Sequence, residues 1–368
     1  MDDKSRIGLS ARLRERIESH GPISFHDWMQ AALYDERQGY YRRTGIKRWG
    51  REGDYRTSPE RSPLFATTFA RFFRTLYEEL GSPASWTVWE AGAGAGHFAE
   101  GVLESFNSSY PHILAATRYI IDDINTNARS LIDEKLARFA PHFEYRSLFD
   151  SPAPSENGIV FANELLDAFP VHRVTVEGGR LLELFITTGE AGNFTWTTGE
   201  LSTPLIAEYL RQLDVVLAEG QLAEVNLHAI DWLKRAAAVF KRGYLVLVDY
   251  GAEAHELYDK SLRPEGSLRA FGRHHLIEDA LLEPGEHDLT TTVDWTTIKR
   301  ACREAGLEII SLERQDRFLL RAGILEELER MTAGETADAA TLNLRASARE
   351  MILPGGMSES FQVLVAKG

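Results

Sequence analysis

Short apolar runs alternate with amphipathic segments along most of the chain, and this alternation predicts an α/β protein. Phenylalanine and leucine recur at helical spacing over 64–80, which predicts a helix with a buried face. The repeated order strand, loop, helix, strand is typical of a parallel, doubly wound sheet. The expected strands are 85–90, 118–123, 143–146, 158–163, 244–249, 308–312 and 361–366, and the helices between them are 97–106, 128–139, 226–240, 295–305, 322–332 and 338–350.

The pattern changes in three places, which we interpret as additions to this core. Two short helices, 5–19 and 24–34, precede an irregular stretch, 39–63. A β-meander and a helix interrupt the core pattern, and a long loop region, 251–294, interrupts it again. The expected parts are a helical and loop region at 1–83 that forms part of a ligand cleft, the first half of the core at 84–170, an insertion at 171–222, and the second half of the core at 223–368.

A glycine-rich loop, Glu90-Ala-Gly-Ala-Gly-Ala-Gly96, joins the first core strand to its helix. Gly92, Gly94 and Gly96 would let the backbone pass close to a ligand. A carboxylate at Glu90 would repel the pyrophosphate of a dinucleotide, but it would attract the sulfonium and amino groups of S-adenosylmethionine. The loop therefore predicts an S-adenosylmethionine site in a Rossmann-like fold.

An acid on the second strand of such folds binds the ribose hydroxyls. Asp123 is the first candidate for this role and Asp122 is the second. An acid at this position would fit NAD as well, and Gly94-x-Gly96-x-x-Ala99 also matches the dinucleotide pattern. An NAD(P)-dependent oxidoreductase therefore stays an alternative.

A second polar motif, Asn163-Glu164-Leu-Leu-Asp167, follows the strand 158–163 at the sheet edge where ligands bind. Glu164 and Asp167 are three residues apart, so one helical turn would place both on one face. An arginine acceptor is cationic and weakly nucleophilic, so its methylation would need acids that orient the guanidinium and accept a proton. The candidate catalytic residues are Asn163, Glu164, Asp167 and Glu60; Asp249, at the end of strand 244–249, would either face the cleft or cap the strand.

Composition narrows the partners. The chain has 41 Lys and Arg against 55 Asp and Glu, a net charge of −14, which disfavours nucleic acid and favours a basic or neutral substrate or a protein partner. Cys302 is the single cysteine, which fits a reducing compartment. No apolar run is long enough for a membrane span, and the early acids argue against a transit peptide, so we expect a cytoplasmic location. The spacing of His274, His275, His287 and Asp288 matches no compact metal site, so no metal is expected.

The motifs, taken in order over about residues 20–366, resemble the MidA-type methyltransferases, a family related to the mitochondrial complex I assembly factor that methylates arginine. The resemblance rests on Gly21-Pro22-Ile23, Gly39-Tyr40-Tyr41, Gly53-Asp54-Tyr55 with Thr57-Ser58-Pro59-Glu60, the glycine-rich loop, Asn163 to Pro170, Asp249-Tyr250-Gly251, Gly266 to Phe271 with His274, Pro284-Gly285, Asp288-Leu-Thr290, Val293-Asp294 and Pro354-Gly355-Gly356-Met357.

The resemblance implies a class I methyltransferase fold whose last strand is antiparallel, S-adenosylmethionine as cofactor, and a protein arginine acceptor, which in the mitochondrial member belongs to a respiratory complex I subunit. It also implies roles for individual residues. Gly53, Asp54, Thr57, Glu90, Gly92, Gly94 and Asp123 would line the cofactor, and Asn163, Glu164 and Asp167 would face its junction with the acceptor.

The chain departs from the family pattern after Glu60. The family tends to carry Ile-Ser and then Phe-Gly-Glu, whereas this chain has Arg61-Ser62 and then Phe65-Ala66-Thr67, so Thr67 replaces an acid. The second strand also ends in Asp122-Asp123 where the family prefers a lone Glu. The altered segment 61–67 motivates a second alternative, a non-catalytic assembly factor that keeps the methyltransferase fold and binds a client.

Overall fold

The main sheet of the computed structural model has the strand order β15-β16-β10-β5-β2-β3-β4, with β14 paired to β10 beside this path. Strands β4, β3, β2, β5 and β10 are parallel, whereas β16 is antiparallel to both of its neighbours. The predicted parallel sheet and antiparallel last strand are therefore confirmed. The bounds are β2 (Trp86–Ala91), β3 (Thr117–Asp122), β4 (Phe143–Tyr145), β5 (Ser155–Asn163), β10 (Phe240–Ala252), β14 (Val293–Asp294), β15 (Glu308–Arg314) and β16 (Phe361–Lys367).

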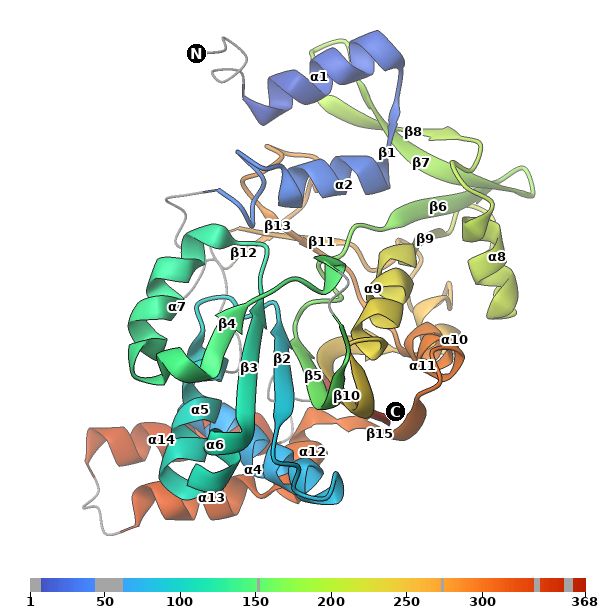
Figure 1. Ribbon diagram of the computed structural model, residues 1–368. Helices are drawn as coiled ribbons and strands as arrows, with labels where there is room; N and C mark the ends of the chain where they lie inside the picture. The colour runs from blue at the N-terminus through green and yellow to red at the C-terminus, as the bar shows by residue number, and fades with distance from the viewer. Residues whose placement is uncertain (1–7, 44–61, 151–152, 273–274, 334–337, 354–359) are drawn as a thin grey trace.

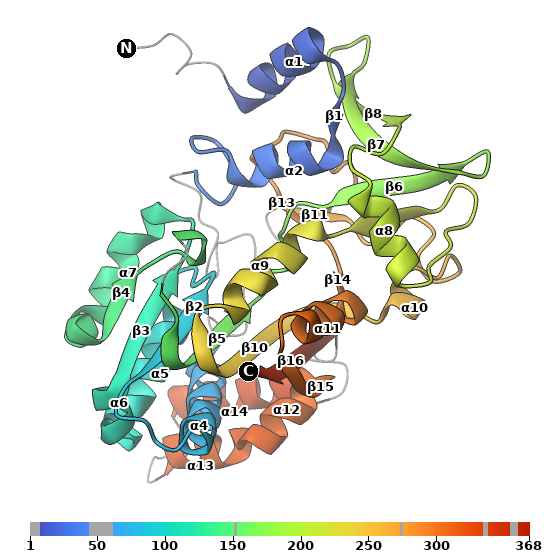
Figure 2. The ribbon, with the colours of Figure 1, turned by 45° about the vertical axis from the view of Figure 1, so that its right-hand side comes forward.

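The structure describes residues 8–43, 62–150, 153–272, 275–333, 338–353 and 360–368. Helices cover both faces of the main sheet (Figures 1 and 2). One face packs against α4 (Pro63–Glu79), α5 (His97–Ser109), α6 (Pro111–Ala116), α7 (Arg129–Leu136), α12 (Gln315–Ala322), α13 (Ile324–Thr332) and α14 (Ala339–Ile352). The other face packs against α9 (Leu227–Ala237) and α11 (Trp295–Glu304).

The two faces are built by alternation along the strands, because neighbouring side chains of a strand point to opposite sides. In β5, Phe161 stacks on Phe98 of α5 with ring centroids 4.0 Å apart. Its neighbour Val160 belongs to the core on the other face, together with Trp89 of β2. Three short 3₁₀ helices lie near these strands: η2 (Thr126–Ala128) after β3, η3 (Ala137–His142) between α7 and β4, and η4 (Leu148–Asp150) after β4.

A second, antiparallel sheet lies above the main one in Figures 1 and 2. It contains the predicted meander as β6 (His172–Glu177), β7 (Arg180–Thr188) and β8 (Phe194–Gly199), followed by α8 (Leu205–Gln212) and β9 (Leu222–Val225). The strand β1 (Ile23–Ser24) pairs with β7, and Ile23 lies opposite Ile186. This pairing joins α1 (Leu9–His20) and α2 (Phe25–Tyr34) to the insertion as one unit.

Residues 251–294 are not only a loop. They contain a three-stranded sheet, β12-β11-β13, made of β11 (Arg269–Gly272), β12 (His275–Ile277) and β13 (Asp288–Thr290), and the short helix α10 (Ala254–Leu257). The expectation of irregular structure was wrong here because strands of three or four residues are too short to show a period. Helix α12 was also missed, since it follows β15 directly.

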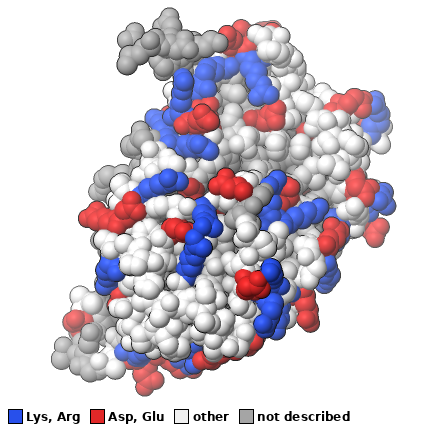
Figure 3. Space-filling view, in the orientation of Figure 1, with Lys and Arg blue, Asp and Glu red and all other residues white. Residues whose placement is uncertain are grey.

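The molecular surface mixes both signs of charge. On the face shown in Figure 3, acidic and basic side chains are interspersed. Within the described ranges, no helix is both long and apolar enough to cross a membrane.

Gly101 tests the packing of α4 against α5. A Cβ atom at this position would lie 2.5 Å from the Cβ of Ala66, far inside van der Waals contact. We expect Gly101→Ala to lower the free energy of unfolding by about 1–3 kcal/mol, because overpacking outweighs the gain in helix propensity. Chemical denaturation measures the change. Gly8→Ala is the control, because a Cβ there meets no atom within 4 Å; equal stability of both variants would contradict this packing.

Candidate functional site

A cavity of about 410 Å³ lies at the carboxyl ends of β2, β3 and β5. Its size falls within the range of small-molecule sites, and its position is that of ligands in open α/β sheets. The core contributes the glycine-rich loop and the ends of the strands. The addition contributes α2 and the segment after it, and β13 closes a further side.

The glycine-rich loop adopts backbone angles that favour glycine. Gly92, Gly94 and Gly96 have φ values of 73°, 56° and 76°, in the left-handed region. Their N–H groups donate to the carbonyl oxygen of Asp122, to Oδ2 of Asp123 and to the carbonyl oxygen of Ala93, respectively. None of these three N–H groups is left for a pyrophosphate.

Glu90 lies at the end of β2 and is 3% exposed. The hydroxyl of Tyr119 donates a hydrogen bond to its Oε2 at 2.6 Å. Burial and, to a smaller extent, the charge of Asp123 raise the pKa of Glu90, the Tyr119 hydrogen bond lowers it in part, and the resulting pKa is about 8. Glu90 lines the cavity, as predicted. Among the described residues, no basic side chain forms an ion pair with it.

Asp122 and Asp123 both line the cavity at the end of β3. Asp122 accepts a hydrogen bond from the N–H of Leu148 at 2.9 Å, and burial raises its pKa to about 6. Asp123 accepts from the N–H groups of Gly94 and Asn125 at 2.8 and 2.7 Å. Asp123 thus also holds the glycine-rich loop in place, which sequence spacing did not indicate.

The motif after β5 is a turn, so the expected helical turn carrying Glu164 and Asp167 was wrong. Glu164 has a φ of 53°. The carboxylate of Asp249 accepts hydrogen bonds from the N–H groups of Leu165, Leu166 and Asp167 at 3.0–3.4 Å. Of the two roles expected for Asp249, the structure shows the strand-end cap. Asp249 is absent from the described lining of the cavity.

Asn163, Glu164 and Asp167 all line the cavity. Nδ2 of Asn163 donates to Oε1 of Glu164 at 3.0 Å, and the hydroxyl of Tyr250 donates to Oδ2 of Asp167 at 2.7 Å. Burial raises the pKa of Asp167 to about 6. Within the described part of the chain, Oδ1 of Asn163 and Oδ1 of Asp167 are buried without a hydrogen-bond partner. Both oxygens can therefore accept a hydrogen bond from a ligand.

The charge of the lining has one sign. The described lining residues include no Lys or Arg, and burial lowers the pKa of both lining histidines, His97 and His228, which keeps them neutral. Six acids line the cavity: Glu90, Asp122, Asp123, Glu164, Asp167 and Asp288. Such a cavity suits ligands that bring positive charge and N–H donors.

Four predicted residues, Gly53, Asp54, Thr57 and Glu60, lie outside the described residues. Among the residues the structure does describe, no group of three or more His, Cys, Asp and Glu side chains is arranged to hold a metal ion. Cys302 is buried in α11.

Several side chains of the lining carry no signal of their role in the sequence. Ile124 and Phe149 are 42% and 49% exposed, and they line the cavity together with Trp232 of α9. Tyr34 and Tyr41 reach it from the addition. No local pattern could bring these segments together, although Tyr41 and Asp288 lie in motifs of the family resemblance.

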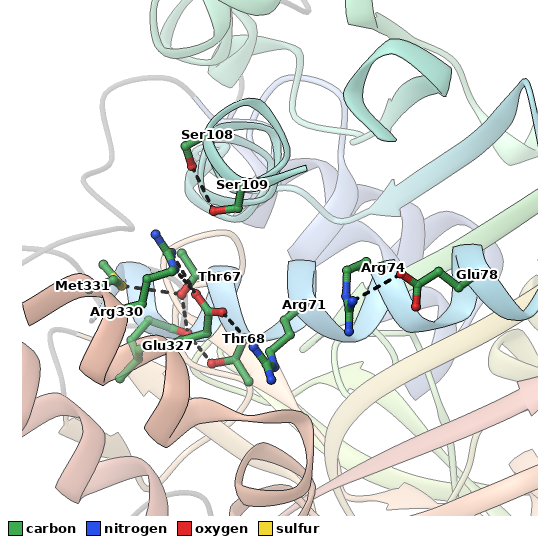
Figure 4. Close-up of polar contacts among 11 residues, drawn as sticks. Thr67, Thr68, Arg71, Arg74, Glu78, Ser108, Ser109, Glu327, Arg330 and Met331 are labelled. Carbon is green, nitrogen blue, oxygen red and sulfur yellow. Dashed lines mark hydrogen bonds and ion pairs between the residues drawn. The ribbon is translucent and has the colours of Figure 1, made fainter. Parts of the chain in front are cut away.

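Thr67, which replaces a family acid, lies away from the cavity. It is buried in α4 and donates a hydrogen bond to the carbonyl oxygen of Leu64 at 3.2 Å, and its hydroxyl lies 3.7 Å from Sδ of Met331 (Figure 4). Glu327 of α13, paired with Arg71 and Arg330, lies beside it. The substitution therefore affects the packing of α4 on α13 and removes no acid from the described lining.

Comparison with known proteins identifies the family. Residues 68–312, well over half of the chain, match the model of a family described as "Putative S-adenosyl-L-methionine-dependent methyltransferase". The chain belongs to this family. The resemblance to MidA-type methyltransferases is thereby confirmed, S-adenosylmethionine is the cofactor, and the NAD(P) alternative is wrong.

Solved structures agree with this assignment. The crystal structure of a likely methyl transferase from Burkholderia thailandensis, bound to S-adenosyl-homocysteine, is 30% identical in sequence to this chain. The two structures have a TM-score of 0.87, and the match covers 98% of this chain and 92% of that chain. Among curated relatives, the "Protein arginine methyltransferase NDUFAF7 homolog, mitochondrial" of Drosophila melanogaster is 25% identical and covers 81% of this chain and 70% of the relative. The human protein arginine methyltransferase NDUFAF7 is also 25% identical, and the match covers 85% of this chain and 72% of the relative.

The buried carboxyl of Glu90 predicts that cofactor binding depends on pH. With a pKa of about 8, Glu90 is mostly protonated at pH 7 in the free protein. A cationic ligand favours the ionised form and lowers this pKa, so binding releases a proton, and affinity increases with pH up to about 8, by at most about tenfold per pH unit. Calorimetry with S-adenosylmethionine, in two buffers of different ionisation enthalpy, measures affinity and proton release.

The matched variant is Glu90→Gln, which keeps the shape and removes the titration. We expect its affinity at pH 8.5 to be roughly 10- to 100-fold below that of the wild type, because a charge-assisted hydrogen bond is lost. Its affinity would then be nearly constant from pH 6 to pH 8. Proton release of the same size in both proteins would show that another group titrates.

Proposed function

We propose that this methyltransferase acts on an arginine side chain of a protein client. The observation that carries the proposal is a pair of buried acceptor atoms, Oδ1 of Asn163 and Oδ1 of Asp167, which have no hydrogen-bond partner among the described residues and lie in a cavity lined by acids. A guanidinium is a cation with five N–H donors and no acceptor, so it complements this lining. The names of the curated relatives support the same acceptor.

The cofactor half of the cavity is assigned by chemistry. When bound, S-adenosylmethionine supplies an electrophilic methyl group on a positively charged sulfur. Glu90 would attract the positive charge of its methionyl end, and Asp123, with Asp122 as the second choice, would accept hydrogen bonds from the ribose hydroxyls. Ile124 and Phe149 offer exposed apolar surface beside these acids, which suits the faces of an adenine ring.

The acceptor half has to orient a nitrogen and remove a proton. The guanidino nitrogen forms a C–N bond to the methyl carbon as the C–S bond breaks and its electron pair stays on sulfur. The nitrogen then gives up one proton. Asp167 would take it; its burial in the lining, and an Oδ1 atom without a partner among the described residues, support this role. Asn163 and Glu164, linked by a hydrogen bond, would orient the guanidinium beside it.

The packing role of Thr67 reduces support for a non-catalytic assembly factor. That alternative rested on the altered segment 61–67. Thr67 contacts α13 and is absent from the described lining, so its replacement of an acid does not remove a catalytic group from that lining.

Transfer of labelled methyl groups tests the proposed function. We incubate the full chain with lysate proteins and methyl-labelled S-adenosylmethionine, hydrolyse the labelled proteins and identify the methylated amino acid. Methylarginine is the expected product. Label found only in another amino acid or in a small molecule would exclude an arginine acceptor, and no transfer at all would favour the assembly factor.

Asp167→Asn should reduce the rate of label transfer roughly 100-fold or more, because a positioned base is lost. Its affinity for S-adenosyl-homocysteine should change little, since the loss falls on the acceptor side. Asp231→Asn, at a half-exposed carboxylate on α9 outside the lining, is the matched control and should transfer at the wild-type rate. Wild-type activity of Asp167→Asn would remove Asp167 from the chemistry.

A further inference from the structure

Two pairs of tyrosine and aspartate line the same cavity. The hydroxyl of Tyr250 donates to Oδ2 of Asp167 at 2.7 Å, and the hydroxyl of Tyr41 donates to Oδ1 of Asp288 at 2.6 Å. Both carboxylates are buried, with exposed fractions of 5% and 6%. The four residues come from β10, the turn after β5, the segment after α2, and β13. The two pairs therefore join the core, the N-terminal addition and the small third sheet.

Hydrogen bonds bring the two pairs close together. The N–H of Thr291, directly after β13, donates to the carbonyl oxygen of Asp167 at 2.9 Å. The hydroxyl of Tyr34 donates to the carbonyl oxygen of Ala168 at 2.9 Å, and its ring stacks on that of Tyr41 with centroids 5.5 Å apart. The segments that carry the two carboxylates are thus tied to one stacked aromatic pair.

The electrostatics around Tyr34 agree with this arrangement. Burial raises the pKa of Tyr34 well above its ordinary value, and the charges of Asp288 and Asp167 raise it further. Both carboxylates are therefore near enough to act on the same hydroxyl.

We propose that Asp167 and Asp288 together hold the guanidinium of the acceptor arginine. Tyr250 and Tyr41 are positioning residues that fix the two carboxylates, and the stacked rings of Tyr34 and Tyr41 provide an aromatic surface beside the cation. The assignment rests on the proposed arginine acceptor and extends it to residues of the addition and of β13. Asp288 thereby becomes a substrate contact that determines which side chain is accepted.

The geometry selects the planar, forked guanidinium over other cations. A guanidinium directs N–H donors along several edges, so it can bridge two carboxylates from different segments and stack on an aromatic ring at the same time. A lysine ammonium is a compact charge that gains less from two separated acceptors and an aromatic face. Citrulline keeps the shape of arginine but carries no charge, which makes it the matched neutral probe.

The test measures discrimination between peptides. The full chain, saturated with S-adenosyl-homocysteine, is titrated in a calorimeter with acetyl-Gly-Arg-Gly-amide and with the citrulline and lysine counterparts. The wild type should bind the arginine peptide at least about tenfold more tightly than either counterpart. Asp288→Asn should reduce the preference for arginine over citrulline by roughly 10-fold or more, and Tyr41→Phe by a smaller factor.

Two controls separate the subsite from general damage. The affinity for S-adenosyl-homocysteine should stay within about twofold of wild type in both variants. Glu278→Gln removes an exposed acid of the segment between β12 and β13, absent from the described lining, and should leave the preference unchanged. If Asp288→Asn loses S-adenosyl-homocysteine binding through misfolding, Tyr41→Phe decides, because it removes only a hydroxyl.

Unchanged preference for arginine in Tyr41→Phe and in a folded Asp288→Asn would overturn the assignment, as would a wild type that binds the three peptides equally. These failures differ from failure of the proposed function. If methylarginine still forms in lysate, the acceptor stands and the subsite is elsewhere, whereas label on another amino acid removes the acceptor itself.

Discussion

Buried carboxylates that accept hydrogen bonds from tyrosine hydroxyls are the constraint on which the site depends. Burying a charged group is costly unless hydrogen bonds or an opposite charge compensate, and proteins usually pair such acids with Arg or Lys. Here hydroxyls and backbone N–H groups take that place. Tyr119 serves Glu90, Tyr250 serves Asp167 and Tyr41 serves Asp288. Because neutral donors cancel no charge, Asp167 keeps its negative charge at neutral pH, and Glu90 can gain one when a cationic ligand binds.

The second sheet gives the N-terminal addition its position over these carboxylates. Two residues of β1 pair with β7, so the helices at the start of the chain are fixed to an insertion more than 150 residues later. Through this link α2 places Tyr34 over the turn that carries Asp167, where its hydroxyl bonds to Ala168. The N-terminal addition is thus part of the cavity wall. Loss of the short β1–β7 pairing would displace Tyr34 from the acceptor side of the cavity.

The parts of the site that sequence analysis predicted are those encoded within one short segment. The glycine-rich loop needs left-handed backbone at Gly92, Gly94 and Gly96, and only glycine adopts this readily, so the pattern is visible in the sequence. The helical turn after β5 failed for a tertiary reason. The carboxylate of Asp249, 82 or more residues away, takes the N–H groups of Leu165 to Asp167 and holds them in a turn. The spacing of residues 163–167 in the sequence does not indicate these hydrogen bonds to Asp249.

The same distinction explains why the acceptor side was only half predicted. Asp167 follows a strong strand pattern, whereas Asp288 lies in a three-residue strand whose role depends on contact with Tyr41, 247 positions away. Long-range contacts of this kind appear only once the sheets are assembled.

Charge conservation links these residues to the chemistry. Before transfer, the cavity would hold two positive charges, one on the sulfonium and one on the guanidinium. Afterwards the sulfur is a neutral thioether, and the methylated guanidinium keeps its charge once it has released a proton. If Asp167 takes that proton, the cavity loses one negative charge as it loses one positive charge, so the local balance is preserved.

Burial holds the pKa of Asp167 near 6, close enough to neutrality for the proton to pass on to solvent. A carboxylate paired permanently with an arginine of the chain would have a lower pKa and would be a poorer acceptor. The absence of Lys and Arg from the described lining is therefore consistent both with attraction of the cations and with turnover of the proton.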